Sequence, residues 1–190
     1  MKRKPTNPIT NIRTGSGDLG YTFFKQPSVS KNDPLIHFIG DLDEACAAFG
    51  RCEIGFDFGG NDEIELQNKM SDLITNTLEV FFMIGGMTHS DDAKKKHFQK
   101  LDTYVEDVER VMSAAVESGF LEPLNGFIIP NEENGDLMLA RAVIRRAERS
   151  AVAAGQYDFV KVLNAMSDFT FLLTWYTSHF YEEWTGFTEV

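Results

Sequence analysis

Apolar side chains recur every three to four residues through five long stretches of this 190-residue chain. The stretches are 34–49, 64–88, 94–118, 136–154 and 158–181. In the second stretch, the apolar face comprises Leu66, Met70, Leu73, Ile74, Leu78, Phe81 and Phe82. This period is typical of amphipathic helices, and no stretch shows the strict alternation of a half-buried strand. The sequence therefore predicts an all-α fold, a five-helix bundle.

Residues 1–33 differ from the rest of the chain in composition. They are rich in Gly, Pro, Ser, Thr and Asn, with turn signals in TGSGDLG and KQPSVSKNDP. Such a segment is typical of a loop or arm rather than of a helix. Asp33 followed by Pro34 is the pattern of an N-cap residue and a proline at the first helical position. We therefore expect an N-terminal glycine-rich loop over 1–33 and a single helical domain over 34–190.

The chain is acidic, with 18 Lys and Arg against 29 Asp and Glu and a formal net charge of −11. This argues against a broad surface for nucleic acid or anionic membranes, because phosphate backbones are bound by clustered basic side chains. Cys46 and Cys52 lack the spacing of a disulfide framework or a zinc site, and the four histidines show no metal-ligand spacing. No signal peptide or membrane span is recognisable. We expect a soluble, cytoplasmic protein without a resident metal.

Against this acidic background, the stretch ARAVIRRAER at residues 140–149 concentrates four arginines. At about 100° per residue, Arg141, Arg145 and Glu148 fall within roughly 60° of one another, and Arg149 lies about 40° beyond Arg145. The opposite side of this helix is apolar. The guanidinium group suits phosphate or carboxylate oxygens, because it donates paired hydrogen bonds and keeps its charge. The alternative is a solvated helix face with i,i+4 ion pairs.

Two further segments offer groups that could serve the same anion. In TGSGDLGYT, residues 14–22, closely spaced glycines let backbone amides approach an anion, although a plain turn explains the same pattern. In KVLNAMSD, residues 161–168, Lys161, Asn164 and Asp168 share one face of an otherwise apolar helix. Polar groups beside so much apolar surface need partners, which makes them structural caps or ligand contacts. Asp168 could equally be the structural partner of an arginine.

Taken in order, these segments resemble the ATP:cob(I)alamin adenosyltransferases of the propanediol-utilisation (PduO) type. The family pattern runs T-[K/R]-x-G-D-x-G-x-T, K-x-D-P-R-[IV]-x-A-Y-G-x-V-D-E-L-N, F-[IV]-L-P-G-G, A-R-x-x-x-R-R-A-E-R and L-N-R-L-S-D. The corresponding segments here read TGSGDLGYT, KNDPLIHFIGDLDEA, FIIP, ARAVIRRAER and LNAMSD. The resemblance covers nearly the whole chain. It implies a five-helix bundle that assembles as a homotrimer, with its sites between neighbouring subunits.

The resemblance also implies an activity and roles for particular residues. The activity is transfer of the 5′-deoxyadenosyl group from ATP to cob(I)alamin, with Mg²⁺ accompanying the nucleotide. The residues implied to cradle the triphosphate are Thr14, Gly17, Asp18, Gly20 and Thr22, with Lys31 adding charge. Those implied to hold ATP are Arg145, Glu148 and Asn164. Arg141 would pair with Asp43 of a neighbouring subunit, and Phe127 would lie under the corrin ring and keep a lower axial ligand off the cobalt. Arg145, Asn164 and Phe127 are the residues implied to act in catalysis.

The chain departs from the family pattern at several positions. Gly15 stands where the family has Lys or Arg, Cys46 where it has Asn, and Ala165 where it has Arg. From Asn131 the sequence continues Asn-Glu-Glu-Asn instead of Gly-Gly, and the loop before the arginine helix is shorter. Two positive charges are lost and two carboxylates gained, which should weaken triphosphate binding. An alternative function therefore stays open, that of a catalytically silent relative that binds or sequesters an adenine nucleotide or a nucleotide-derived signal. A third is a helical scaffold without a ligand.

Overall fold

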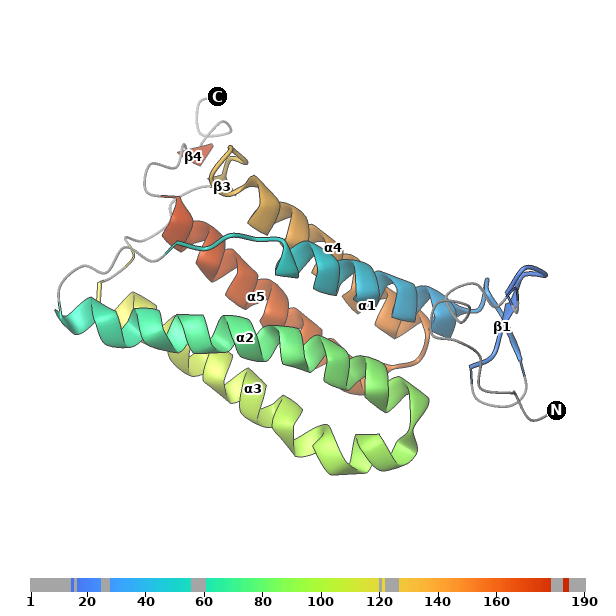
Figure 1. Cartoon of the computed structure of the whole chain (residues 1–190). Coiled ribbons are helices and arrows are strands. Elements are labelled where there is room, and N and C mark those ends of the chain that lie inside the picture. The colour runs from blue at the N-terminus through green and yellow to red at the C-terminus, as the bar shows by residue number, and fades with distance from the viewer. Residues whose placement is uncertain are drawn as a thin grey trace, which may run out of the picture.

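The structure, a computed structural model, describes residues 15, 17–24, 28–55, 61–119, 121, 127–178 and 183–184. Its helices are α1 (Pro34–Gly50), α2 (Asn61–His89), α3 (Asp91–Glu117), α4 (Gly135–Ala153) and α5 (Val160–Thr177), with a short 3-10 helix, η2 (Tyr157–Phe159), before α5. Figure 1 shows the helices side by side in one bundle. The predicted all-α five-helix bundle is confirmed.

The helix boundaries follow from local hydrogen bonds. The side chain of Asp33 accepts a hydrogen bond from the backbone N–H of Leu35 at 2.9 Å, so the predicted N-cap of α1 is confirmed. The third helix begins at Asp91 rather than at 94, because Ser90 caps it by accepting from the N–H of Ala93. The fifth helix ends at Thr177 rather than at 181, and the chain beyond it returns as a strand.

Two short antiparallel strand pairs were not predicted. They are β1 (Tyr21–Thr22) with β2 (Val29–Ser30), and β3 (Phe127–Ile128) with β4 (Glu183–Trp184). In the second pair, Phe127 lies opposite Trp184. Strands of two residues are too short for an alternating pattern to be recognised in the sequence.

The core depends on close packing of α4, which contacts both α1 and α5, while α3 contacts α2 and α5. Small side chains allow this approach, since Ala140, Ala147 and Ala151 are fully buried. The expected apolar face of α2 is wrong at one position: Phe81 is buried, but Phe82 is 76% exposed. Consecutive helical residues point about 100° apart, so only one of two adjacent phenylalanines can face the core.

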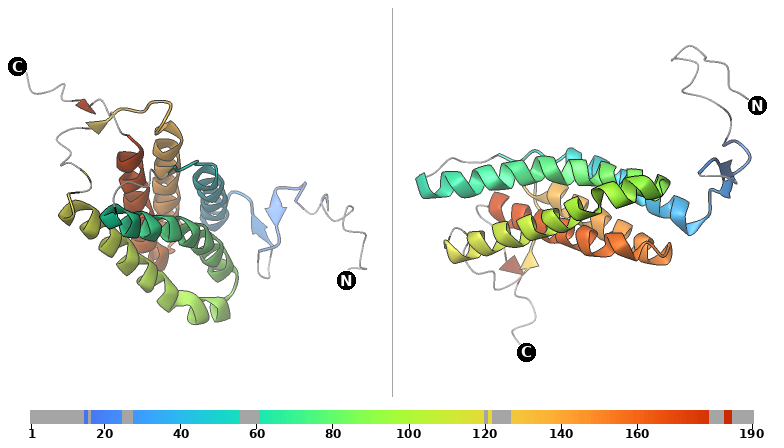
Figure 2. Two further views of the ribbon diagram at one scale, coloured as in Figure 1. Left: turned by 60° about the vertical axis from the view of Figure 1, so that its left-hand side comes forward. Right: turned by 90° about the horizontal axis from the view of Figure 1, so that it is seen from below.

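The β1–β2 hairpin lies outside the bundle, at the end where α1 begins (Figures 1 and 2). Phe24 joins the segment after β1 to the helices: it is 6% exposed, and its ring centroid lies 4.3 Å from that of His89 at the end of α2. Among the helices in the described ranges, none is long and apolar enough to cross a membrane. The division of the chain near residue 33 stays a prediction.

Candidate active site

Arg141 and Arg145 lie one turn apart on α4, on the side that faces α5. Arg141 is half-buried, and its guanidinium carbon lies 5.0 Å from the ring centroid of Phe171 on α5. Arg145 is exposed. Burial and then the charge of Arg145 lower the pKa of Arg141, against the opposing effect of Asp168. Arginine does not lose its proton at neutral pH, so the helix holds two positive charges in a partly desolvated place.

Asp168 on α5 is the acidic group of this cluster. Burial raises its pKa, while Arg141 and Arg145 act in the opposite direction. Asn164, one turn earlier on α5, donates a hydrogen bond from Nδ2 to Asp168 Oδ2 at 3.1 Å. The charges of two guanidinium groups therefore act on one carboxylate, so positive charge is in excess among Arg141, Arg145 and Asp168. Such a surplus favours a further anion, because charge-assisted hydrogen bonds are among the strongest available to the side chains.

Arg141 also carries a donor without an acceptor. Its Nε atom is buried and has no hydrogen-bond partner within the described part of the chain. A buried donor left unsatisfied costs about 1–3 kcal/mol. A ligand or a neighbouring subunit that brings an oxygen to this atom would therefore bind with a gain at Arg141.

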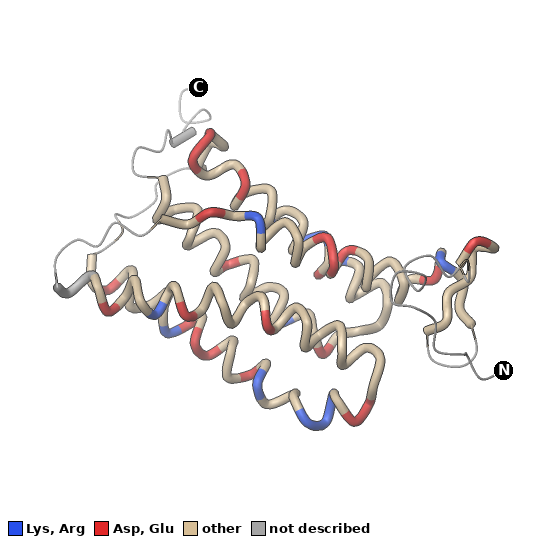
Figure 3. Tube along the Cα trace, in the orientation of Figure 1, with Lys and Arg blue, Asp and Glu red and all other residues tan. Residues whose placement is uncertain are grey.

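Arg146 belongs to a different environment, which the sequence reasoning missed. Its Nε lies 3.2 Å from Asp41 Oδ1 on α1, and its guanidinium also pairs with Glu44. Ser150 shares the Asp41 carboxylate. Figure 3 shows red, acidic segments along α1 and blue, basic segments along the neighbouring α4. Of these adjacent arginines, Arg146 therefore joins α4 to α1, whereas Arg145 faces Asp168 on α5.

The remaining charged residues of the arginine helix lie farther along it. Glu148 is half-buried and Arg149 is exposed, both beyond the turn that carries Arg145. Lys161 is exposed on α5, at the helix end away from Asp168. The structure therefore brings Arg141, Arg145, Asn164 and Asp168 together, and these four positions form the cluster that we call the α4–α5 cluster.

The glycine-rich segment forms a tight turn before β1. Gly15 and Gly20 have positive φ angles of 66° and 81°, which glycine adopts without strain. The N–H of Asp18 donates to the carbonyl of Gly15, and the N–H of Gly20 donates to that of Gly17. Thr22 lies on β1 and is half-buried, whereas Thr14 lies outside the described residues. A side chain at Gly15 would be strained, so the family's cation could not stand there in this backbone.

Lys31 supplies a positive charge at this turn. A Cβ atom built on Gly17 would lie 2.8 Å from Lys31 Nζ, so the ammonium group rests directly against the Gly17 backbone. The backbone N–H of Lys31 also donates to the carbonyl of Gly20 at 2.9 Å. Gly17 is thus required for the close approach of this lysine. The sequence separates these residues widely, but the β1–β2 hairpin brings them together.

The glycine turn and the α4–α5 cluster belong to different elements of the fold. The hairpin lies outside the bundle at the end where α1 begins, whereas the cluster is carried by α4 and α5 within the bundle (Figures 1 and 2). The described residues that the resemblance assigns to one nucleotide are therefore divided between the hairpin and the helices, and we call these two groups half-sites.

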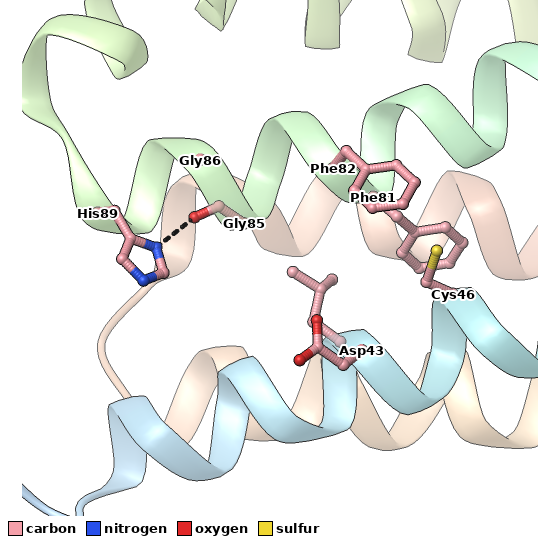
Figure 4. A pocket seen from close by; sticks show the side chains of 8 residues that line it. Asp43, Cys46, Phe81, Phe82, Gly85, Gly86 and His89 are labelled. Carbon is pink, nitrogen blue, oxygen red and sulfur yellow. Dashed lines mark hydrogen bonds between the residues drawn. The ribbon is translucent and has the colours of Figure 1, made fainter. Parts of the chain in front are cut away.

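Asp43 likewise lies away from Arg141. It is exposed on α1 and lines a pocket of about 250 Å³ between α1 and α2, together with Cys46, Phe82 and His89. Figure 4 shows its carboxylate pointing into the space between the two helices. No ion pair joins Asp43 to Arg141 in the described residues. Burial and then the charge of Asp43 raise the pKa of Cys46, the residue that replaces the family's asparagine.

Two other predicted positions have contrasting environments. Phe127 is 71% exposed on β3, although its neighbour Ile128 is buried. Ala165, where the family pattern has arginine, is 7% exposed and belongs to the core. Across the described residues, no group of three or more His, Cys, Asp or Glu side chains is arranged to hold a metal ion.

Comparison with known proteins gives a consistent result. Residues 12–177 match the family described as cobalamin adenosyltransferase. The chain is 27% identical to the corrinoid adenosyltransferase MMAB of Bos taurus over 91% of this chain and 73% of that protein. It is 28% identical to the corrinoid adenosyltransferase of Mycobacterium leprae over 87% of this chain and 90% of that protein.

Solved structures show the same fold. A variant of the PduO-type ATP:corrinoid adenosyltransferase from Lactobacillus reuteri, complexed with ATP, superposes with a TM-score of 0.59 at 20% identity, over 86% of this chain and 92% of that chain. Another variant of the same enzyme, complexed with cobalamin and ATP, gives a TM-score of 0.58 at 22% identity, over 87% and 92% of the two chains. The family match extends from the glycine turn through the arginine helix and α5, so this chain belongs to the cobalamin adenosyltransferase family.

Proposed function

We infer that this chain is an ATP:corrinoid adenosyltransferase, which transfers the 5′-deoxyadenosyl group from ATP to cob(I)alamin. Membership of the family supports this activity. The observation that carries it in the structure is the α4–α5 cluster, in which Arg141 and Arg145 outnumber the single carboxylate of Asp168. Such a surplus suits a ligand with several anionic oxygens, as a triphosphate has.

The reaction is a substitution at the C5′ carbon of ATP. The electron pair of Co(I) forms the cobalt–carbon bond, the bond from C5′ to oxygen breaks, and its electrons leave with the triphosphate. No side-chain nucleophile is needed, because the corrinoid substrate supplies one. The protein's contribution is orientation of the two substrates and stabilisation of the charge on the leaving triphosphate.

We propose that Arg145 and Asn164 hold the nucleotide at the α4–α5 cluster, with Glu148 contributing from the next turn. Thr14, Gly17, Asp18, Gly20 and Thr22 would cradle the triphosphate, with the ammonium group of Lys31 beside them. Phe127 would cover the lower face of the corrin ring. Its 71% exposure on β3 leaves the ring accessible to a ligand, as that role requires.

We further propose that the complete site forms between neighbouring copies of a homotrimer. The division of these residues between the hairpin and the helices supports this, because each part of the fold would supply one half of a site (Figures 1 and 2). The unsatisfied Nε of Arg141 and the exposed carboxylate of Asp43 are complementary in charge and would meet across the interface. An exposed ion pair contributes only about 0–1 kcal/mol, so the apolar surface around Phe82 would supply most of the association energy.

Mg²⁺ is proposed to accompany the nucleotide. This ion commonly binds through phosphate oxygens, waters and one or two carboxylates, so it does not require a dedicated protein cage. A cytoplasmic location is proposed from the two free cysteines, which are typical of a reducing compartment.

The main alternative remains a nucleotide-binding relative without adenosyl transfer. It is favoured by Gly15 and Ala165, which remove cations expected near the triphosphate, and by the exposed Glu132 and Glu133. The test is to mix the purified protein with ATP, Mg²⁺ and chemically reduced cob(I)alamin and to follow the visible spectrum for adenosylcobalamin. A parallel ATP titration separates the cases, because binding without turnover supports the alternative and turnover excludes it.

A further inference from the structure

Asn134 immediately precedes α4 and is fully buried, with 0% exposure. Its Oδ1 accepts a hydrogen bond from the backbone N–H of Asn131 at 3.0 Å. Its Nδ2 donates to the carbonyl of Ile129 at 3.3 Å and to Ser178 Oγ at 2.9 Å. An acceptor and two donors on one side chain are thus used at once, which a carboxamide can provide and a hydroxyl or carboxylate cannot.

The side chain of Asn134 does not cap α4, although Asn134 occupies the N-cap position. Asparagine at a helix N-cap normally accepts from a backbone N–H of the first turn, an interaction worth about 1 kcal/mol. Asn134 occupies the N-cap position of α4 but makes no such side-chain bond. Its polar atoms face the preceding loop and α5 instead. Capping of α4 therefore does not explain why an amide is buried here.

The hydrogen bonds of Asn134 connect the loop that carries Phe127 to the end of α5. Ile129 follows β3 directly, so its carbonyl fixes the chain just after Phe127. Ser178 immediately follows α5 and donates its own hydroxyl to the carbonyl of Thr174 at 2.7 Å. On the other side, β3 is held by its pairing with β4. The backbone at Phe127 is therefore fixed from both directions.

The hydrogen bonds of Asn134 lie about two helical turns from the α4–α5 cluster. Arg141 follows Asn134 by about two helical turns, or roughly 10 Å along α4. Ser178 follows Phe171 by a similar distance on α5, and Phe171 is the ring that Arg141 covers. The contact between Asn134 and Ser178 thus ties α4 to α5 at the end of the bundle that carries Phe127.

We propose that Asn134 is a positioning residue for Phe127: its buried amide sets the place of the shortened β3–α4 loop relative to α5, and so the place of the ring on the corrinoid side of the site. It lies in the loop whose sequence departs from the Gly-Gly of the family pattern. The inference rests on the proposed function, since it concerns the corrinoid substrate of that reaction.

The chain offers a matched pair of substitutions three residues apart in the same loop. Asn131 Oδ1 accepts from the N–H groups of Glu133 and Asn134, at 2.9 and 3.0 Å, and Asn131→Asp keeps an oxygen that can accept both hydrogen bonds. Asn134→Asp adds the same charge but sets an oxygen against the carbonyl of Ile129. A third variant, Ser178→Ala, removes one of the hydrogen bonds of Asn134 and buries no charge.

Each variant is measured for its ATP affinity, its kcat and KM for the corrinoid, and its thermal unfolding. Corrinoid binding is followed separately by quenching of tryptophan fluorescence in a Trp175→Phe background, which leaves Trp184 opposite Phe127. The electron paramagnetic resonance spectrum of bound cob(II)alamin reports whether a lower axial ligand is kept off the cobalt.

We expect Asn134→Asp to lower kcat/KM for the corrinoid by about tenfold to a hundredfold, because small misplacements of positioning groups have effects of that size. ATP affinity should stay unchanged, and the cob(II)alamin spectrum should shift toward the form with a lower ligand. Ser178→Ala should show the same selective loss to a smaller degree, and Asn131→Asp should match the wild type.

Unchanged corrinoid parameters in a folded Asn134→Asp protein would overturn the proposal. If that variant unfolds or loses both substrates equally, Ser178→Ala decides, and wild-type corrinoid behaviour there also overturns it. A wild-type protein that binds the corrinoid but does not transfer the adenosyl group refutes the proposed function, while the fluorescence and resonance comparison still tests Asn134. A wild-type protein that binds no corrinoid refutes both.

Discussion

Arg145 and Arg146 are adjacent, chemically identical and different in their surroundings, so they form a natural pair for mutation to alanine. Arg145 is exposed beside Asp168 on the α5 side, whereas Arg146 pairs with Asp41 and Glu44 of α1. Alanine is a strong helix former, so neither change should disturb α4 through backbone propensity. The structure predicts that one substitution affects ligand binding and the other affects stability.

The expected magnitudes differ accordingly. Loss of a charge-assisted hydrogen bond from Arg145 to a phosphate should cost about 1.5–3 kcal/mol, which raises the Kd for ATP about 10- to 150-fold. The side chain of Arg146 is 41% exposed, and those of Asp41 and Glu44 are 23% and 58% exposed. Solvent screening limits such pairs, so Arg146→Ala should cost about 0.5–1.5 kcal/mol of unfolding free energy, or roughly 1–6 °C in Tm.

Isothermal titration with ATP and thermal unfolding followed by circular dichroism measure the two effects on the same preparations. Arg145→Ala should lose affinity and keep its Tm, and Arg146→Ala should do the reverse. Wild-type affinity in Arg145→Ala would show that this residue is only a solvated helix position. An equal loss of affinity in both variants would refute the division of the arginines between two environments.

Three further predictions follow from single contacts. Asp43→Arg, which sets two like charges against each other, should weaken the trimer, and the added change Arg141→Asp should strengthen it again, as measured by light scattering over a range of concentrations; a double variant that dissociates as readily as Asp43→Arg would argue against this pair. The raised pKa of Asp168 means that the folded state holds the carboxyl proton more tightly than the unfolded chain does. The free energy of unfolding of the wild type should therefore fall as the pH rises from the ordinary pKa of 3.8 through the higher pKa of the folded state. Asp168→Asn should gain stability relative to the wild type across that pH range. If the difference in unfolding free energy between the two proteins, measured with urea, did not change with pH, the raised pKa of Asp168 would be contradicted. Cys52 should alkylate slowly at about pH 8, because burial and then Asp136 raise its pKa to about 11; a rate equal to that of free glutathione would be inconsistent with this environment.

The sequence was sufficient for the helices because their apolar faces repeat over many turns. Asp33 and Pro34 gave the start of α1 for the same kind of reason, since capping is a local interaction. Phe82 was misassigned because two adjacent phenylalanines satisfy the same pattern, and only packing against α1 decides which is buried. The strand pairs depend on contacts between distant segments and leave no periodic signal.

The candidate site was predictable in its parts but not in its arrangement. Residue spacing put Arg141 and Arg145 on one stripe, yet it gave no reason to pair Arg146 with α1, because that contact requires Asp41 from a separate helix. The buried hydrogen bonds of Asn134 were also invisible, since its partner Ser178 lies at the far end of the chain. Acidic residues on α1 at i,i+3 spacing, Asp41 and Glu44, were the one available signal for the Arg146 contact.

In the proposed trimer, the nucleotide is bound between the glycine turn of one copy and the α4–α5 cluster of another. Mixed oligomers of Lys31→Glu and Arg145→Glu test it directly, because each variant damages a different half-site. If sites are shared between copies, equal mixing by unfolding and reassembly should place two undamaged halves together in about a quarter of the sites, by random pairing around a closed ring. Adenosylcobalamin formation should then recover to about a quarter of the wild-type rate, although each variant alone is inactive. Mixed oligomers that remain as inactive as the parent variants, beside a wild type that is active after the same reassembly, would contradict a site shared between copies.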